Sequence, residues 1–170
     1  GGYVHTPKEG IHEDIVLFDF ASLYPSITIT HNVSPETLDC SCCSEGKNKV
    51  PELKHHYCTK RTGFVTRVLE DLVVKRVEIK EKMEKLGKGS REYQYLNNRQ
   101  YALKILANAS YGYYGYPGSR WYSKVCAESI TSLGRNYIKS VIALAEKLGF
   151  PVIYGDTDSL FLRMKEKDIG

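Results

Sequence analysis

Two aspartates two positions apart, Asp156 and Asp158, are the side chains of this chain best suited to do chemistry. The apolar segments around them predict two strands joined by a tight turn, with both carboxylates on the same side. Like charges about 4 Å apart repel each other by roughly 4 kcal/mol at an effective dielectric of about 20, so such a pair is expected to hold a cation. Carboxylate oxygens suit Mg²⁺, and Mn²⁺ can substitute for it.

A third carboxylate, Asp19, follows the apolar run Ile15–Phe18 and is the candidate for completing this site. Such a site could hold two ions, and two-metal sites clamp both the attacking and the leaving oxygen of a phosphoryl transfer. The alternative is an acidic turn that faces water, because aspartate is common in turns for its local hydrogen bonding. The spacing of the aspartates alone leaves both interpretations open.

Three segments of the chain occur in an order that is typical of one enzyme family. They are DFASLYPSI at 19–27, KILANASYG at 104–112 and YGDTDS at 154–159, and shorter matches are GGYV at 1–4, THNVSP at 30–35, YGYYGY at 111–116 and RWY at 120–122. Together they closely resemble the polymerase motifs of the family B DNA polymerases, most nearly the archaeal branch. The resemblance spans essentially the whole chain. It implies a DNA-directed DNA polymerase, a nucleotidyltransferase that adds deoxynucleotides to a primer 3′-hydroxyl.

The same resemblance implies an α+β fold, in which an antiparallel palm sheet carries the catalytic aspartates and a long antiparallel two-helix hairpin forms the fingers. Residues 1–63 are then the first part of the palm, with a cysteine-containing loop at 33–63. Residues 64–112 are the fingers, and residues 113–170 are the second part of the palm, with the catalytic hairpin at 152–164. Because the N-terminal, exonuclease and thumb domains of such enzymes are not encoded here, we expect a fragment with weak or no activity alone.

The apolar pattern predicts the elements that position the three aspartates. Residues 14–20 are expected to form a buried strand that ends near Asp19, because four consecutive apolar residues are bounded by polar ones. Residues 21–30 are expected to form a short helix that Ser22 can cap. Residues 152–164 are expected to form a strand, a turn and a second strand.

Three long helices are expected elsewhere in the chain. Apolar residues at helical spacing predict one helix at 64–87, and Ser90 can cap a second that runs to about residue 111. The four-residue break between them predicts an antiparallel hairpin. An aromatic, glycine-rich loop at 113–119 precedes a third helix at about 121–148.

Two rows of polar side chains on the predicted hairpin could bind a triphosphate. One row is Arg76 and Lys80, and the other is Gln100, Lys104, Asn108 and Tyr111. The alternative for the first row is a solvated helix face with glutamate partners. The resemblance implies that Arg76, Lys80 and Lys104 neutralise the phosphates, that Asn108 hydrogen-bonds one of them, and that Tyr111 lies against the nascent base pair.

The segment after Asp19 is expected to contact the same nucleotide. By resemblance, the Tyr24 ring packs beneath the sugar and excludes a 2′-hydroxyl, the group that distinguishes ribonucleotides from deoxyribonucleotides. The alternative is an ordinary core tyrosine. The backbone amides of Ser22 and Leu23 open a helix and can meet phosphate oxygens.

The expected cofactor is a pair of Mg²⁺ ions. Asp19 and Asp158 are the first-choice ligands, Asp156 is a further nearby carboxylate, and the backbone carbonyl of Phe20 can complete one coordination shell. Such ions assist attack of the primer 3′-hydroxyl on the α-phosphorus and the departure of pyrophosphate. The expected partners are therefore primer–template DNA, deoxynucleoside triphosphates and the remaining polymerase domains.

The irregular segment 33–63 contains a group of thiols and imidazoles, namely Cys40, Cys42, Cys43, Cys58, His55 and His56. These residue types are zinc ligands, although their spacing is not that of a standard zinc finger. By resemblance to archaeal relatives, Cys43 and Cys58 lie nearest to the positions of a disulfide. Free thiols are the third alternative, because disulfides are uncommon in the cytosol.

The composition is that of an ordinary globular domain, with 42% hydrophobic residues and a formal net charge of +4. This charge is too mild to indicate nucleic-acid binding alone, but Arg67–Lys104 holds ten basic and six acidic residues and should carry the positive field. No apolar run approaches the ~20 residues needed to cross a bilayer, so a cytoplasmic protein of a prokaryotic or archaeal cell, without membrane association, is expected. The alternative function is a non-catalytic DNA-binding or structural module derived from a polymerase.

Overall fold

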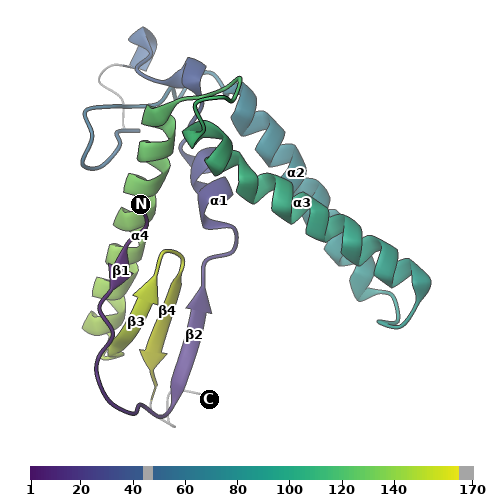
Figure 1. Cartoon of the computed structure of the whole chain (residues 1–170), viewed down its shortest axis with the longest axis vertical. Coiled ribbons are helices and arrows are strands. Elements are labelled where there is room, and N and C mark those ends of the chain that lie inside the picture. Colours follow the sequence, from purple (N-terminus) through teal and green to yellow (C-terminus); the bar gives the residue numbers. More distant parts are fainter. Residues whose placement is uncertain (44–47, 165–170) are drawn as a thin grey trace.

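The computed structural model describes residues 1–43 and 48–164. These residues form four α-helices, two short 3₁₀ helices and one antiparallel sheet of four strands, so the expected α+β class is confirmed (Figure 1). The elements in chain order are β1 (Val4–His5), β2 (Ile15–Asp19), α1 (Leu23–Thr30), η1 (Pro35–Thr37), η2 (Ser41–Cys43), α2 (Phe64–Glu84), α3 (Arg91–Gly115), α4 (Lys124–Lys147), β3 (Val152–Asp156) and β4 (Ser159–Arg163).

The sheet has the strand order β1-β3-β4-β2, with the β3–β4 hairpin at its centre. Helix α4 runs beside the sheet (Figure 1) and packs against it. The buried contacts between them are made by Ile138, Ile142 and Ala145 of α4 and by Val152, Leu160 and Leu162 of the hairpin. The hairpin is therefore held by one helix behind it and by a strand on each side.

Strand β2 is less buried than its apolar sequence predicts. It lies at the edge of the sheet and pairs only with β4, from Ile15 opposite Arg163 to Asp19 opposite Ser159. Leu17 and Phe18 remain 55% and 52% exposed. The expectation of a buried strand was wrong, because a continuous apolar run is compatible with a central strand or with an edge whose faces are only partly covered.

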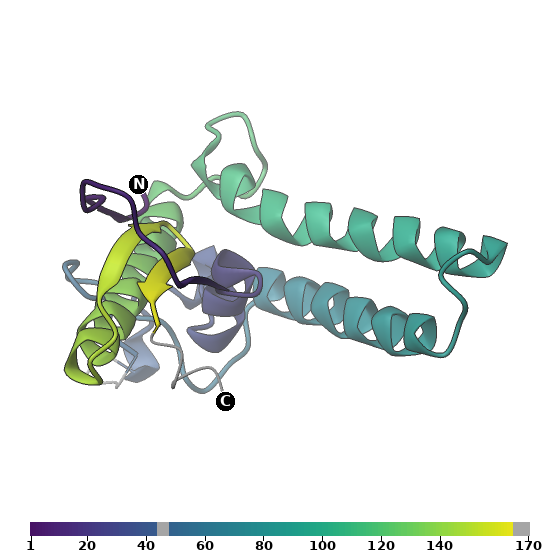
Figure 2. The same cartoon turned by 90° about the horizontal axis from the view of Figure 1, so that it is seen from below.

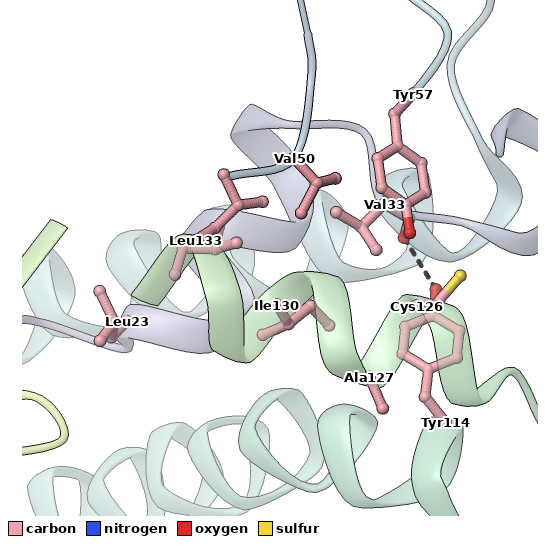
Figure 3. Packing of buried hydrophobic residues seen from close by; sticks show 10 residues of the cluster. Leu23, Val33, Val50, Tyr57, Tyr114, Cys126, Ala127, Ile130 and Leu133 are labelled. Atoms are coloured by element: carbon pink, nitrogen blue, oxygen red, sulfur yellow. Dashed lines mark hydrogen bonds between the residues drawn. The ribbon is translucent and has the colours of Figure 1, made fainter. Parts of the chain in front are cut away.

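The main core joins α1, α4, the end of α3 and the segment that precedes α2 (Figure 3). Its buried members include Leu23, Val33, Tyr57, Tyr114, Cys126, Ala127, Ile130 and Leu133. Two buried hydroxyls are satisfied across it: Tyr57 Oη donates to Ser129 Oγ at 2.9 Å, and Tyr114 Oη donates to the Val33 carbonyl at 2.9 Å. These bonds fix the irregular segment to the helices.

Helices α2 and α3 form an antiparallel hairpin that projects away from the sheet and α4 (Figure 2). Leu69, Ile79, Met83 and Ala107 are its buried apolar residues. Ser90 caps α3 as predicted, because its Oγ accepts a hydrogen bond from the Tyr93 amide at 3.1 Å. The hairpin therefore has the arrangement that the sequence pattern indicated.

Three expected details of the helices were wrong. Helix α3 continues to Gly115 through the first part of the expected loop, because Tyr114 is buried in the main core. Helix α4 begins at Lys124, later than expected, with Ser123 Oγ accepting from the Cys126 amide at 3.2 Å. Ser22 precedes α1 in the left-handed region, at φ 54°, and its side chain makes no capping hydrogen bond.

Tyr114→Phe is expected to lower the free energy of unfolding of the chain by about 1–2 kcal/mol, because the buried Val33 carbonyl loses its hydrogen-bond donor. Urea denaturation followed by circular dichroism measures this change. Tyr116→Phe, at a position 65% exposed, is the matched control and should change the unfolding free energy by less than about 0.5 kcal/mol. Equal stability of the two variants would show that the Tyr114 hydroxyl contributes nothing.

Candidate active site

The register of the sheet brings Asp19 beside the turn of the β3–β4 hairpin. Ser159 at the start of β4 pairs with Asp19 on one side and with Asp156 on the other. Beyond the end of β2, the Phe20 amide donates to the Asp158 carbonyl at 2.8 Å. Two segments far apart in the chain are thus joined at the point where their carboxylates lie.

The backbone of the turn separates the roles of Asp156 and Asp158. Thr157 has φ 51°, and its amide donates to the Tyr3 carbonyl at 2.8 Å, which fixes the tip of the turn. Asp158 lines a cavity next to Asp19, whereas Asp156 does not. Asp156 Oδ1 instead accepts a hydrogen bond from Thr157 Oγ1 at 2.9 Å. Strand alternation had suggested that both carboxylates would face the same side. In the structure only Asp158 faces the cavity.

The raised pKa of Asp158 indicates that a bound cation would stabilise its ionised form. Partial burial raises the pKa of Asp158, and the nearby negative charge of Asp19 raises it further; Asp156 adds to this effect, while Lys104 opposes it. Among the described residues, neither Asp19, Asp156 nor Asp158 has a salt-bridge partner. Uncompensated carboxylate oxygens of this kind fit a hard divalent cation such as Mg²⁺ or Mn²⁺.

The cavity beside these carboxylates has a volume of about 520 Å³. It lies between the start of α1, the turn of the β3–β4 hairpin and the near parts of α2 and α3. Its lining residues are Asp19, Phe20, Ala21, Ser22, Leu23, Tyr24, Pro25, Arg76, Lys80, Lys104, Asn108, Thr157 and Asp158. The structure thus brings together all but three of the residues that the sequence had indicated for the metal and the nucleotide; the exceptions are Gln100, Tyr111 and Asp156.

The wall formed by the hairpin helices is basic. Arg76 and Lys80 of α2 lie one turn apart, and Lys104 of α3 lines the same cavity. Arg76 Nε donates to Gln100 Oε1 at 3.1 Å across the two helices, which orients the guanidinium group. Three cations therefore share with two carboxylates a cavity wide enough for a phosphorylated ligand.

Tyr24 also lines the cavity, and its ring packs against another aromatic ring. The rings of Tyr24 and Tyr111 have centroids 4.7 Å apart and are tilted by 49°. Tyr111 does not line the cavity itself. Burial raises the pKa of the Tyr24 hydroxyl, and Tyr111 and Asp158 raise it further, so Tyr24 stays neutral.

Several residues at the site were missed by sequence reasoning. Ala21, Pro25 and Thr157 line the cavity, and a signal for them existed because they lie within the two aspartate motifs. Gly134 of α4 had no such signal. A Cβ atom at Gly134 would lie 3.3 Å from Tyr24 Cε1, so the glycine leaves room for the tyrosine ring.

The cysteines lie away from this cavity and are all free thiols. The Sγ atoms of Cys43 and Cys58 are 3.9 Å apart, whereas a disulfide requires about 2.05 Å. The disulfide implied by the resemblance is therefore not formed in this structure. Instead, the Sγ atoms of Cys40, Cys42, Cys43 and Cys58 all lie within 4.8 Å of one another.

The helices were compared with the length and hydropathy of membrane-spanning segments. None of those formed by residues 1–43 and 48–164 combines the length and the apolar character that spanning a bilayer requires.

Comparison with known proteins identifies the family. The family model described as "DNA polymerase family B" matches residues 1–170 of the chain. The chain is 52% identical over 162 residues to a DNA polymerase of Pyrococcus glycovorans, covering 95% of this chain and 21% of that protein. It is also 52% identical over 161 residues to a DNA polymerase of Thermococcus sp. (strain 9oN-7), covering 94% of this chain and 20% of that protein.

A solved structure agrees with the sequence relatives. The family B DNA polymerase from the hyperthermophilic archaeon Pyrobaculum calidifontis superposes with a TM-score of 0.79 at 42% identity, covering 94% of this chain and 21% of that one. The chain thus spans about a fifth of the length of the relatives it matches. It belongs to DNA polymerase family B.

Proposed function

We propose that this chain is the nucleotide-addition core of a DNA-directed DNA polymerase. The observation that carries the proposal is the cavity in which Asp19 and Asp158 share a space with Arg76, Lys80 and Lys104. Phosphoryl transfer from a triphosphate requires carboxylates that hold divalent cations and basic groups that bind phosphates. This one cavity contains both kinds of group.

In this proposal the chain divides into palm and fingers. Residues 1–63 and 113–170 are the palm, which contains the sheet and α4, and residues 64–112 are the fingers. The projection of the α2–α3 hairpin from the sheet supports this division (Figure 2). The last residues of α3, up to Gly115, run from the fingers into the main core of the palm through Tyr114.

The substrates are a deoxynucleoside triphosphate and the 3′ end of a primer paired to template DNA. Arg76, Lys80 and Lys104 neutralise the triphosphate, and Arg76 can bind two phosphate oxygens at once. Asn108 donates a hydrogen bond to a phosphate, as do the backbone amides of Ser22 and Leu23 at the start of α1. The nucleotide is thereby held with its α-phosphorus near Asp19 and Asp158.

Asp19, Asp158 and the Phe20 carbonyl would hold two Mg²⁺ ions, with Asp156 as an outer carboxylate; when bound, the ions make the primer 3′-hydroxyl more acidic and stabilise the departing pyrophosphate. The primer 3′-oxygen forms a bond to the α-phosphorus, and the bond from that phosphorus to pyrophosphate breaks. The residues of the chain fix both reactants in line for this exchange, and such positioning supplies much of the catalysis.

Primer extension tests the proposed function. The chain is assayed alone and spliced between the flanking segments of the Pyrococcus glycovorans relative, with Mg²⁺ and all four deoxynucleotides. We expect extension by the spliced protein and little by the chain alone, because the chain spans only about a fifth of the relatives it matches and DNA affinity grows with the number of phosphate contacts. A folded spliced protein that binds primer–template without extending it would favour the non-catalytic, structural alternative.

Tyr24→Ala in the spliced protein should admit ribonucleotides, because the ring next to the sugar position is removed. We expect the ratio of kcat/KM for deoxynucleotides over ribonucleotides to fall by about ten-fold or more. Single-nucleotide incorporation with both sugars measures this ratio. The control is Tyr95→Ala, at an exposed position of α3 remote from the cavity, which should leave the ratio unchanged. Unaltered sugar selectivity in Tyr24→Ala would exclude Tyr24 as the gate.

A further inference from the structure

Four cysteines converge at a place that the polymerase chemistry does not use. The thiol cluster consists of Cys40, Cys42, Cys43 and Cys58. Cys42 and Cys43 belong to η2, Cys40 precedes it by one residue, and Cys58 lies in the segment before α2. Three of its members are buried, and Cys42 is exposed. The cluster lies outside the cavity of the candidate active site.

The spacing of the sulfurs fits a tetrahedral ion. Cys42 Sγ lies 3.6 Å from Cys40 Sγ, 3.7 Å from Cys43 Sγ and 3.7 Å from Cys58 Sγ, and the sulfurs of Cys43 and Cys58 are 3.9 Å apart. A zinc ion with four sulfurs about 2.3 Å away places those sulfurs about 3.8 Å from one another. Four of the six separations therefore match the edges of such a tetrahedron, and the other two do not exceed 4.8 Å.

We propose that the thiol cluster is a structural zinc site with four cysteine ligands. A site closed by four thiolates leaves no position for substrate, which is typical of structural zinc and not of catalytic zinc. Binding converts the thiols to thiolates and releases their protons to solvent. No oxidation or reduction takes place.

The surroundings of the sulfurs support metal ligation. The Lys60 amide donates to Cys58 Sγ at 3.4 Å, and the Cys58 amide donates to the Thr37 carbonyl at 2.9 Å. His56 Nε2 lies 3.1 Å from the Cys40 carbonyl oxygen, close enough to hydrogen-bond it. The first contact stabilises negative charge on the Cys58 sulfur, and the other two orient the backbone that carries Cys58 and Cys40.

Hydrophobic contacts contribute little where the two ends of the loop meet at the thiol cluster. Within the described residues, the buried cluster here consists of Cys40, Cys43 and Cys58, with no aliphatic or aromatic side chain among them. Thiols packed only against thiols bury little apolar area, so their contact alone contributes little to stability. A tetrahedral ion would link the two ends of the loop directly.

The proposed ion sits at the base of α2. Asn32 Nδ2 donates to the carbonyls of Cys58 and Arg61, each at 2.7 Å, and Asn32 Oδ1 accepts from the Gly63 amide at 2.7 Å. These bonds tie the residues between the cluster and α2 to the segment after α1. If the proposed function holds, the ion therefore fixes the point from which the helix that carries Arg76 and Lys80 leaves the palm.

Metal analysis of the 170-residue chain tests this inference without reference to polymerase activity. The chain is produced without a histidine tag in zinc-supplemented medium and purified under reducing conditions. We expect one zinc per chain by mass spectrometry of the metal, and the strong visible absorption of a cobalt–thiolate centre when Co²⁺ replaces it. Removal of zinc should lower the melting temperature.

Two cysteine variants test whether cobalt binds at the thiol cluster or at any thiol of the chain. Cys42→Ser changes the exposed ligand, so the chain should still fold by circular dichroism, while its Co²⁺ affinity should fall by more than about 100-fold, since outer partners alone are worth 10–100-fold. Cys126→Ser is the control, because Cys126 is buried in the main core outside the thiol cluster. It should keep full cobalt affinity per folded chain.

Three results would overturn the proposal. A folded wild-type chain that binds neither zinc nor cobalt, and that shows five titratable thiols once it is denatured, would show that the cluster is a set of free thiols. In a second preparation purified and denatured without reductant, only three titratable thiols together with an absence of metal would show a disulfide. Iron in place of zinc in the purified chain would exclude the assigned metal. None of these results depends on primer extension, so failure of the proposed function remains distinguishable.

Discussion

Asp158→Asn in the spliced polymerase is expected to reduce kcat/KM for nucleotide addition by at least about 10³-fold. Asparagine keeps the shape of the side chain but removes the negative charge that, in the proposed function, holds divalent cations together with Asp19. Asp19→Asn should have a similar effect. Rapid-quench measurement of a single incorporation, with primer–template in excess, gives the rate.

The structure supplies a matched control for this change within the same turn. Asp156 lies two residues from Asp158 but does not line the cavity, so Asp156→Asn should have a clearly smaller effect than Asp158→Asn. The stability of Asp158→Asn should not fall, because burial and the charge of Asp19 already disfavour the ionised form of Asp158 in the folded chain. Near-normal turnover by folded Asp158→Asn would exclude the metal assignment.

Lys104→Ala is expected to lower kcat/KM for the incoming nucleotide by about 10²-fold, and Arg76→Ala by a comparable amount. Each removes one positive group from the wall of the cavity where the triphosphate would lie. Arg76→Lys should restore little of the loss, because a lysine cannot bind two oxygens in the planar arrangement of a guanidinium group. Steady-state kinetics with varied nucleotide concentration measures these changes.

The control variants are at basic residues that belong to the same two helices but do not line the cavity. Lys82→Ala on α2 and Arg99→Ala on α3 remove the same charge from outside the cavity, so they should change kcat/KM by less than about three-fold. Affinity for primer–template, measured at fixed salt, should be unaltered in Lys104→Ala. If all four alanine variants lost activity equally, the helices would act through their general positive field and not through a triphosphate site.

The sequence alone determined the order and type of most elements. The spacing of apolar residues at 3.6 positions per turn located the hairpin helices, and Ser90 caps α3 as the sequence predicted. The apolar segments around Asp156 and Asp158 gave the β3–β4 hairpin. These features are local, because each depends on hydrogen bonds and side-chain contacts between residues close together in the chain.

The sequence also indicated which residues would share a site, but mainly through long motifs. Asp158 and Arg76 belong to segments far apart in the chain, and their types alone were also compatible with an acidic turn and a solvated helix face. The structure brings them to one cavity. Charge and spacing identified candidate groups, whereas their convergence depends on how the hairpin and the sheet pack together.

Tertiary structure alone decided several features of the site. The family resemblance ranked Asp158 above Asp156, but strand alternation placed both carboxylates on one side. The left-handed conformation of Thr157, together with its contact to Tyr3, presents only Asp158 to the cavity. Gly134 lies beside Tyr24 although 110 positions separate them, so no local signal could reveal it. The exposure of β2 likewise follows from its place at the edge of the sheet.

For the thiol cluster, too, the sequence identified the candidate residues and the tertiary structure decided how they are arranged. The sequence established that cysteines gather in the loop before α2, but free thiols, a disulfide and zinc all remained compatible with their spacing. The choice depends on distances between sulfurs, and these are set by how the two ends of the loop return to each other against α1 and α4. Local propensity specifies the elements of this protein, whereas the packing of distant segments specifies which of their functional groups meet.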